Sequence, residues 1–254
     1  MSPTSASPST DVDVLAVGAH PDDVELTCGG TLAAFAKRGL RTAILDLTRG
    51  EAGTRGDPAT RAREAADAAR ILGAAFRVTL DLGDGGLRTD RASELEVIDV
   101  VRRCRPRLVI APLPDDRHPD HVRAGRLVAD AAFYAGLRTL ATAHPAHRPQ
   151  QVVYVPSHFV ADPTFLVDVS DVFETKLEAI RAYKSQFHDA ASAEPQTYIS
   201  TPDFLEGVVA QARSFGRMGT VAYAEAFVSR RPPTLADPIA AFEGYEPGFE
   251  RGSR

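Results

Sequence analysis

Two short clusters of histidine and aspartate are the residues of this 254-residue sequence most suited to chemistry. One reads HPDD at 20–23 and the other reads HPDH at 118–121. Imidazole and carboxylate groups are common ligands of zinc and related divalent ions in proteins. A single His-Pro-Asp is most often a capped turn at the start of a helix, but capping does not require two such clusters. Together they predict a metal site.

The predicted ligands are His20, Asp23 and His121. Three protein ligands leave one coordination position open for water, which is typical of catalytic rather than structural zinc. Zinc suits this set, although iron(II), cobalt or manganese accept similar ligands. A bound metal lowers the pKa of its water toward about 7 and prepares that water to attack a carbonyl carbon.

The other residues of the two clusters have predicted roles around that water. Asp22 neighbours a ligand without being one, so we expect it to be the general base. His118 is expected to donate a hydrogen bond or proton to the oxyanion or the leaving amine. Asp120 is expected to orient His118. Covalent catalysis has less support, because the sequence contains no Gly-x-Ser-x-Gly motif and no phosphate-binding loop.

The alternation of apolar segments predicts how the two clusters meet. Strands and helices alternate, which indicates a Rossmann-like, three-layer α/β/α fold with a mostly parallel sheet. Each cluster follows a predicted strand, and the carboxyl ends of neighbouring parallel strands lie side by side. The expected strands are 12–19, 42–47, 76–80, 107–111, 151–155 and 165–169, and the expected helices are 24–38, 60–72, 90–104, 119–135, 170–183 and 204–218, with Ser170 as an N-cap.

The chain is expected to fold as a single domain over 11–230. Residues 1–10 are predicted to be a flexible tail, and 231–254, rich in Pro, Gly and charge, an irregular one. The long segment 185–202 shows no periodicity and is expected to face the substrate. His158, just past a predicted strand, is a further candidate for a substrate contact.

Composition narrows the class of protein. The formal charge of -5 gives no general attraction for nucleic acid or an anionic membrane, and no apolar run is long enough to span a bilayer. The N-terminal residues lack the features of a signal peptide, so a cytoplasmic location is expected. Cys28 and Cys104 are expected to be free thiols.

Four segments of the sequence resemble the PIG-L (LmbE-like) family of N-acetylglucosaminyl deacetylases. They are AHPDDVELTCGGTLA at 19–33, LTRGEAGTRG at 47–56, RAREAADAARILG at 61–73 and PDDRHPDH at 114–121. The resemblance implies a zinc-dependent N-deacetylase, an amidohydrolase acting on linear amides, and a small N-acetylated sugar conjugate as its partner. Carried over by position, it places the metal ligands, the base and the acid histidine on the same residues as the chemistry above.

Three later segments are most similar to the deacetylase of bacillithiol biosynthesis, which acts on N-acetylglucosaminyl-malate. They are AYKSQF at 182–187, TYISTPDFLE at 197–206 and GTVAYAEAF at 219–227. Arg61 matches a family arginine at the substrate pocket, and Arg117 stands beside His118. Either is expected to pair with a substrate carboxylate or, alternatively, to be a solvated surface arginine. The resemblance also implies a homo-oligomer such as a hexamer.

Two alternatives remain open from the sequence. The acceptor could instead be an inositol-linked sugar, a chitooligosaccharide or an antibiotic conjugate. A non-enzymatic metal-binding protein would use the same three ligands, but it would have no need of Asp22 and His118 beside them.

Overall fold

The computed structural model describes residues 10–158, 161–188 and 192–242. Its central sheet has five strands in the order β3-β2-β1-β4-β5, and all four neighbouring pairs are parallel. The predicted parallel sheet is therefore confirmed. Its strands are β1 (Val14–Gly18), β2 (Thr42–Asp46), β3 (Phe76–Thr79), β4 (Leu108–Pro112) and β5 (Gln151–Val155).

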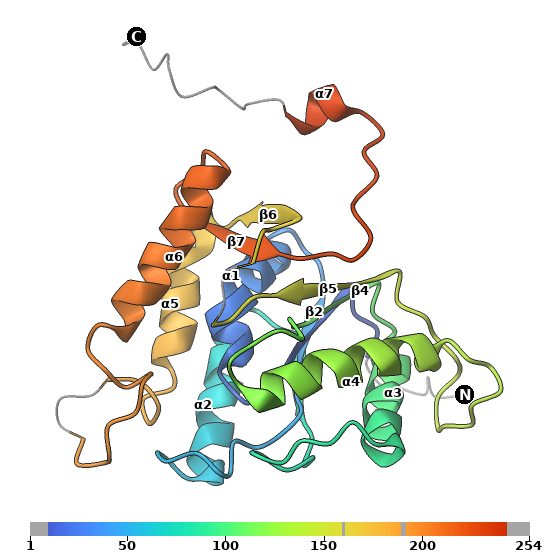
Figure 1. The fold of residues 1–254 in the computed structure, drawn as a ribbon, viewed down its shortest axis with the longest axis horizontal. Coiled ribbons are helices and arrows are strands. Elements are labelled where there is room, and N and C mark those ends of the chain that lie inside the picture. The colour runs from blue at the N-terminus through green and yellow to red at the C-terminus, as the bar shows by residue number, and fades with distance from the viewer. Residues whose placement is uncertain (1–9, 159–160, 189–191, 243–254) are drawn as a thin grey trace, which may run out of the picture.

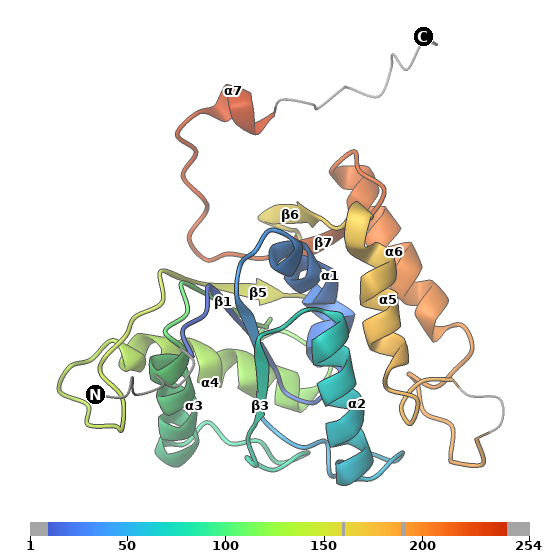
Figure 2. The same ribbon diagram turned by 180° about the vertical axis from the view of Figure 1, so that it is seen from behind.

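Helices cover both faces of the sheet, as Figures 1 and 2 show from opposite sides. In β1, Val14 and Ala16 face a core shared with α1 (Asp23–Lys37), α2 (Pro58–Ile71) and α5 (Phe173–Arg181). The alternate residues Leu15 and Val17 face a second core shared with α3 (Arg91–Cys104) and α4 (Pro119–Ala135). Since successive side chains of a strand point to opposite faces, the apolar run of β1 serves both cores. The predicted three-layer α/β/α fold is confirmed.

The structure departs from the predicted elements near residue 165. The strand predicted at 165–169 is β6 (Phe165–Asp168), and it pairs antiparallel with β7 (Ala224–Phe227) instead of joining the central sheet. The sequence did not predict β7, because its residues, AEAF, have mostly low strand propensity. Ser170 begins a short 3₁₀ turn before α5, and its hydroxyl donates to Asp168, so the predicted N-cap was wrong.

The C-terminal part adds one long helix and one helical turn. α6 (Phe204–Met218) packs against β7, and α7 (Pro238–Ala241) lies apart from the body of the molecule, in the segment that follows β7 (Figure 1). The predicted irregular tail therefore contains a single helical turn, whereas 1–9 and 243–254 lie outside the described residues. Among the described helices, none is long and apolar enough to cross a membrane.

A buried carboxylate fastens β7 to the helices beside it. α1 has a break at Cys28, which leaves backbone amides within the helix without their usual partners. Glu225 accepts hydrogen bonds from the amides of Gly30 and Thr31, at 2.9 and 2.7 Å, and from the Thr31 hydroxyl. It also pairs with the ammonium of Lys176 on α5 at 2.5 Å. One side chain thereby joins three elements that line the pocket described below.

We expect Glu225→Ala to lower the free energy of unfolding by about 3–5 kcal/mol, because it leaves the Lys176 charge and three other donors buried without an acceptor. Lys176→Met should cost less, since Glu225 keeps three of its donors. Glu206→Ala, at an exposed position of α6, is the control and should change stability by about 0.5 kcal/mol or less. Urea unfolding measures the free energy of unfolding of all three variants. Equal losses in Glu225→Ala and Glu206→Ala would contradict the prediction.

Candidate functional site

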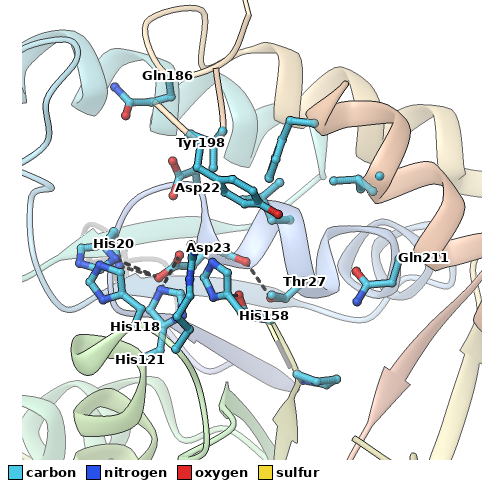
Figure 3. A pocket seen from close by; sticks show the side chains of 18 of the residues that line it. His20, Asp22, Asp23, Thr27, His118, His121, His158, Gln186, Tyr198 and Gln211 are labelled. Atoms are coloured by element: carbon cyan, nitrogen blue, oxygen red, sulfur yellow. Dashed lines mark hydrogen bonds and ion pairs between the residues drawn. The ribbon is translucent and has the colours of Figure 1, made fainter. Parts of the chain in front are cut away.

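The two histidine–aspartate clusters lie side by side at the carboxyl edge of the sheet. β1 and β4 are hydrogen-bonded neighbours, and each is followed by one cluster. The ring centroids of His20, His118 and His121 are 4.8 to 5.6 Å apart. Figure 3 shows these rings gathered around Asp23 at one end of a pocket. The predicted meeting of the two clusters is thus what the fold produces.

The three predicted ligands offer donor atoms to a single point. One atom each from His20, Asp23 and His121 lies within 4.8 Å of the others. Nδ1 of His20 is 3.5 Å from one Asp23 oxygen, and Nε2 of His121 is 3.2 Å from the other. Two imidazoles and a carboxylate at this separation fit a divalent cation.

Each of these imidazoles has a carboxylate behind its other nitrogen. Nε2 of His20 lies 3.0 Å from Asp84 and 3.6 Å from Asp120, and Nδ1 of His121 lies 3.3 Å from Asp116. Metal-bound histidines usually have such partners, which fix the ring and increase its basicity. The sequence prediction missed Asp84 and Asp116. The only available signal was position, since both follow the carboxyl ends of strands in the same sheet.

The charges around the two imidazoles favour a cation. Burial alone lowers the pKa of His20, but hydrogen bonds to Asp120, Asp23 and Asp84 raise it to about 12. Burial likewise lowers the pKa of His121, and the attraction of Asp23 and Asp116 raises it to about 10. A metal ion would compete with protons for these two rings.

Asp22 has the geometry of a separate, unligated acid–base group. It is buried, and its backbone has a φ of 111°, a left-handed conformation that is costly for a residue other than glycine. Figure 3 shows its side chain on the Tyr198 side of the pocket, apart from the histidine rings. Burial raises the pKa of Asp22 and Arg61 lowers it, leaving it at about 7. A base with a pKa near neutrality suits proton transfer at physiological pH.

Arg61 is buried and forms hydrogen bonds within the protein. It is 4% exposed, and its terminal nitrogens donate to the carbonyls of Gly50 at 3.1 Å and Pro21 at 2.6 Å and to Asp22 at 3.3 Å. These bonds use both terminal nitrogens, whereas Nε has no protein partner and Arg61 lines the pocket, so the predicted contact with a substrate carboxylate stays a prediction. Arg61 also holds the strained turn that carries Asp22.

Arg117 lies where a substrate can reach it. It is exposed on the rim of the pocket, and its guanidinium stands 4.9 Å from the centroid of the Tyr198 ring. Tyr198 belongs to the segment 185–202, which was predicted to face the substrate, and neighbouring residues of that segment also line the pocket. Residues 189–191 of this segment lie outside the described residues, and its contact with a substrate stays a prediction.

His118 receives its orientation from the backbone of Asp120. Nδ1 of His118 accepts a hydrogen bond from the Asp120 amide at 3.2 Å, so the neutral ring carries its hydrogen on Nε2. Burial, together with His20 and His121, lowers the pKa of His118 and favours this neutral donor form. The Asp120 carboxylate accepts from the amide of Gly85 instead. The hydrogen bond from Asp120 to His118 thus comes from its backbone amide, and the role of its carboxylate in orienting His118 stays a prediction.

The pocket that contains these groups has a volume of about 940 Å³. Its walls come from the segments that follow β1, β4 and β5, from the loop at 52–55, from 197–201 and from α6. This volume falls within the usual range for small-molecule sites. Cys28 is buried and outside the proposed donor set, and both cysteines are free, as predicted.

Removing a carboxylate behind a ligand should weaken metal binding. We expect Asp84→Asn to lower metal affinity by about 10- to 100-fold, because it removes the negative charge beside Nε2 of His20, and His121→Ala to abolish stoichiometric binding. Asp115→Asn is the control, since Asp115 is exposed and neighbours Asp116. Zinc titration against a competing chelator measures the affinities. Wild-type affinity in the Asp84 variant would contradict the assignment.

Comparison with known proteins places the chain in a family. The profile described as GlcNAc-PI de-N-acetylase (PIG-L) matches residues 15–132. The diacetylchitobiose deacetylase of Thermococcus kodakarensis is 32% identical over 224 residues, which cover 84% of this chain and 80% of that protein. The 4-oxalmesaconate hydratase of Pseudomonas putida is 29% identical over 198 residues, covering 68% and 74%.

A solved structure agrees with these matches. A conserved protein from Thermus thermophilus superposes with a TM-score of 0.81 at 42% identity, covering 89% of this chain and 98% of that one. The similarity thus extends through the elements that surround the pocket. On these grounds the chain belongs to the PIG-L (LmbE-like) deacetylase family.

Proposed function

We propose that this protein hydrolyses the N-acetyl group of an N-acetylglucosaminyl conjugate with the help of a divalent metal ion. The observation that carries the proposal is the convergence of His20, Asp23 and His121 beside Asp22, a buried carboxylate that is not among the donors. A sugar amide as substrate is supported by the relative named as a diacetylchitobiose deacetylase.

Each side chain of the site has a distinct part in this reaction. His20, Asp23 and His121 would hold a divalent ion, for which zinc suits the donor set, and that ion would supply a more acidic water and polarise the amide carbonyl. Asp22 takes the proton of the attacking water, and Arg61 keeps Asp22 in place. His118 donates a hydrogen bond from Nε2 to the developing oxyanion, and Asp22 passes the proton it took from water to the amine as the C–N bond breaks. The proton lost by water ends on the amine, and the products are acetate and a free amino sugar.

The role of Asp22 is tested by Asp22→Asn, which keeps the shape of the side chain and removes its basicity. We expect the rate of acetate release to fall by about 10²- to 10⁴-fold while the metal content stays at the wild-type level. Asp203→Asn, an exposed residue of the same pocket, is the control and should remain active. If Asp22→Asn retains wild-type turnover, the base has been assigned wrongly.

We further propose malate as the group attached to the sugar, as in the precursor of bacillithiol. Support comes from the later segments similar to that branch and from Arg117, which is exposed at the mouth of the pocket. Because the terminal nitrogens of Arg61 already bind Asp22 and two carbonyl groups, the exposed Arg117 is better placed to bind a dicarboxylate. Inositol-linked, chitooligosaccharide and antibiotic acceptors are the alternatives.

Arg117→Ala separates these acceptors. We expect it to lower kcat/KM by about 10-fold on N-acetylglucosaminyl-malate, mainly through KM, and by less than about 2-fold on the uncharged inositol conjugate. Arg63→Ala, on the exposed face of α2, is the control. Acetate release from both substrates, with metal content measured in the same samples, gives the comparison. An equal effect on both substrates would argue against malate.

A second candidate is hydration of a carbon–carbon double bond, because one relative is named as a 4-oxalmesaconate hydratase. The two reactions have different products. An assay of the wild-type protein on N-acetylglucosaminides and on 4-oxalmesaconate distinguishes them, and acetate release without hydration supports the first candidate. Full metal loading with neither activity would favour a metal-binding protein.

A further inference from the structure

A single carboxylate holds two histidines of the pocket. The Asp116 side chain is 2% exposed, and one of its oxygens lies 2.8 Å from Nδ1 of His158 and 3.3 Å from Nδ1 of His121. Its oxygens also accept hydrogen bonds from the backbone amides of His118, at 2.7 Å, and of His158, at 3.2 Å. Asp116 therefore joins the segment after β4 to the segment after β5.

The two rings held by Asp116 have similar orientations. Their centroids are 5.4 Å apart with 29° between the planes. Because both rings use Nδ1 on the same carboxylate, each directs its Nε2 edge away from Asp116. Nε2 of His121 faces Asp23 and the candidate metal position. His158 lines the same pocket beside His121, as Figure 3 shows. Its ligand atom lies within 4.8 Å of atoms of Asp116 and His121, a set that could also hold a cation, but it is not grouped with the donors His20 and Asp23.

The hydrogen bond to Asp116 also fixes what His158 offers to a ligand. An ionised carboxylate only accepts, so Nδ1 of His158 carries the hydrogen, and Nε2 of the neutral ring is an acceptor. His118 has the opposite arrangement, since its Nδ1 accepts from the Asp120 amide and its Nε2 is a donor. The pocket thus presents one imidazole donor and one imidazole acceptor. The donor suits a carbonyl oxygen, and the acceptor suits a hydroxyl group.

We propose that His158 contacts the substrate by accepting a hydrogen bond from a ring hydroxyl of the sugar, and that it thereby selects polyhydroxylated amides over simple N-acetylated amines. This inference rests on the proposed function and specifies its substrate class. Asp116 is the positioning residue for this contact, because it sets both the orientation and the tautomer of His158.

Deoxy substrates test the contact directly. The parent N-acetylglucosaminide is compared with its 3-deoxy, 4-deoxy and 6-deoxy analogues for the wild-type protein, His158→Phe and His158→Gln. We expect the wild type to lose about 10-fold in kcat/KM on one of the analogues, because Nε2 is left without its donor. His158→Phe should lose about as much on the parent and show no further loss on that analogue. His158→Gln keeps an acceptor oxygen and should retain part of the discrimination.

Metal content and thermal stability are measured for each variant, with His144→Phe, outside the pocket lining, as the control. Unchanged metal content in His158→Phe is expected. Loss of metal from His158→Phe would mean that His158 supports the metal centre, and it would overturn the inference. The inference would also be overturned if His158→Phe still discriminated between the parent sugar and the deoxy analogue, or if the wild type did not. If His158→Phe is unstable, the same comparison is made on His158→Gln. Failure of the wild type to release acetate from any of the sugars would instead overturn the proposed function, and the inference with it.

Discussion

The parallel pairing of β1 with β4 brings two segments that are far apart in the sequence to one edge of the sheet. Backbone hydrogen bonds fix this pairing, and two apolar cores clamp it from either side. The positions from which His20 and His121 project are therefore set before any ligand binds. A metal site built on strand ends in this way avoids the ordering cost that a site on unconstrained loops would incur.

Buried charge is the second constraint, and it is balanced group by group. Beneath the turn that carries Asp22, the guanidinium of Arg77 binds both oxygens of Asp46, at 2.6 and 2.7 Å, and reaches Glu25 at 2.6 Å. Tyr183 also donates to Glu25. Charges buried without partners would be costly, whereas a paired set holds a strained turn in one conformation. The environment that raises the pKa of Asp22 is thus part of a wider network around the turn.

The substrate side of the pocket depends on another buried arginine. Arg55 donates to the carbonyls of Ser185 at 2.9 Å and Pro195 at 3.1 Å, while its own carbonyl accepts from Gln186 at 2.7 Å. The segment 47–56 is thereby joined to the segment that presents Tyr198 at the mouth. The metal-binding end of the pocket is built on strand ends, and its mouth is built on loops. Because loops vary more than strands do, the mouth can change its substrate preference while the chemistry at the metal-binding end stays the same.

The sequence by itself determined the kind of chemistry and the class of fold. The HPDD and HPDH clusters contain the histidines and aspartates that are suited to bind a metal ion. The alternation of apolar segments predicts that both clusters follow strands of one sheet. Only the tertiary structure decided which side chains face inward. Arg61 binds Asp22, the Asp120 carboxylate accepts from the amide of Gly85, and Asp116 joins two imidazoles. Spacing along the chain does not encode these choices, because they depend on side-chain direction and on contacts between distant segments. The pairing of β6 with β7 was hidden for a similar reason, since it is stabilised by tertiary contacts and not by the propensity of its residues.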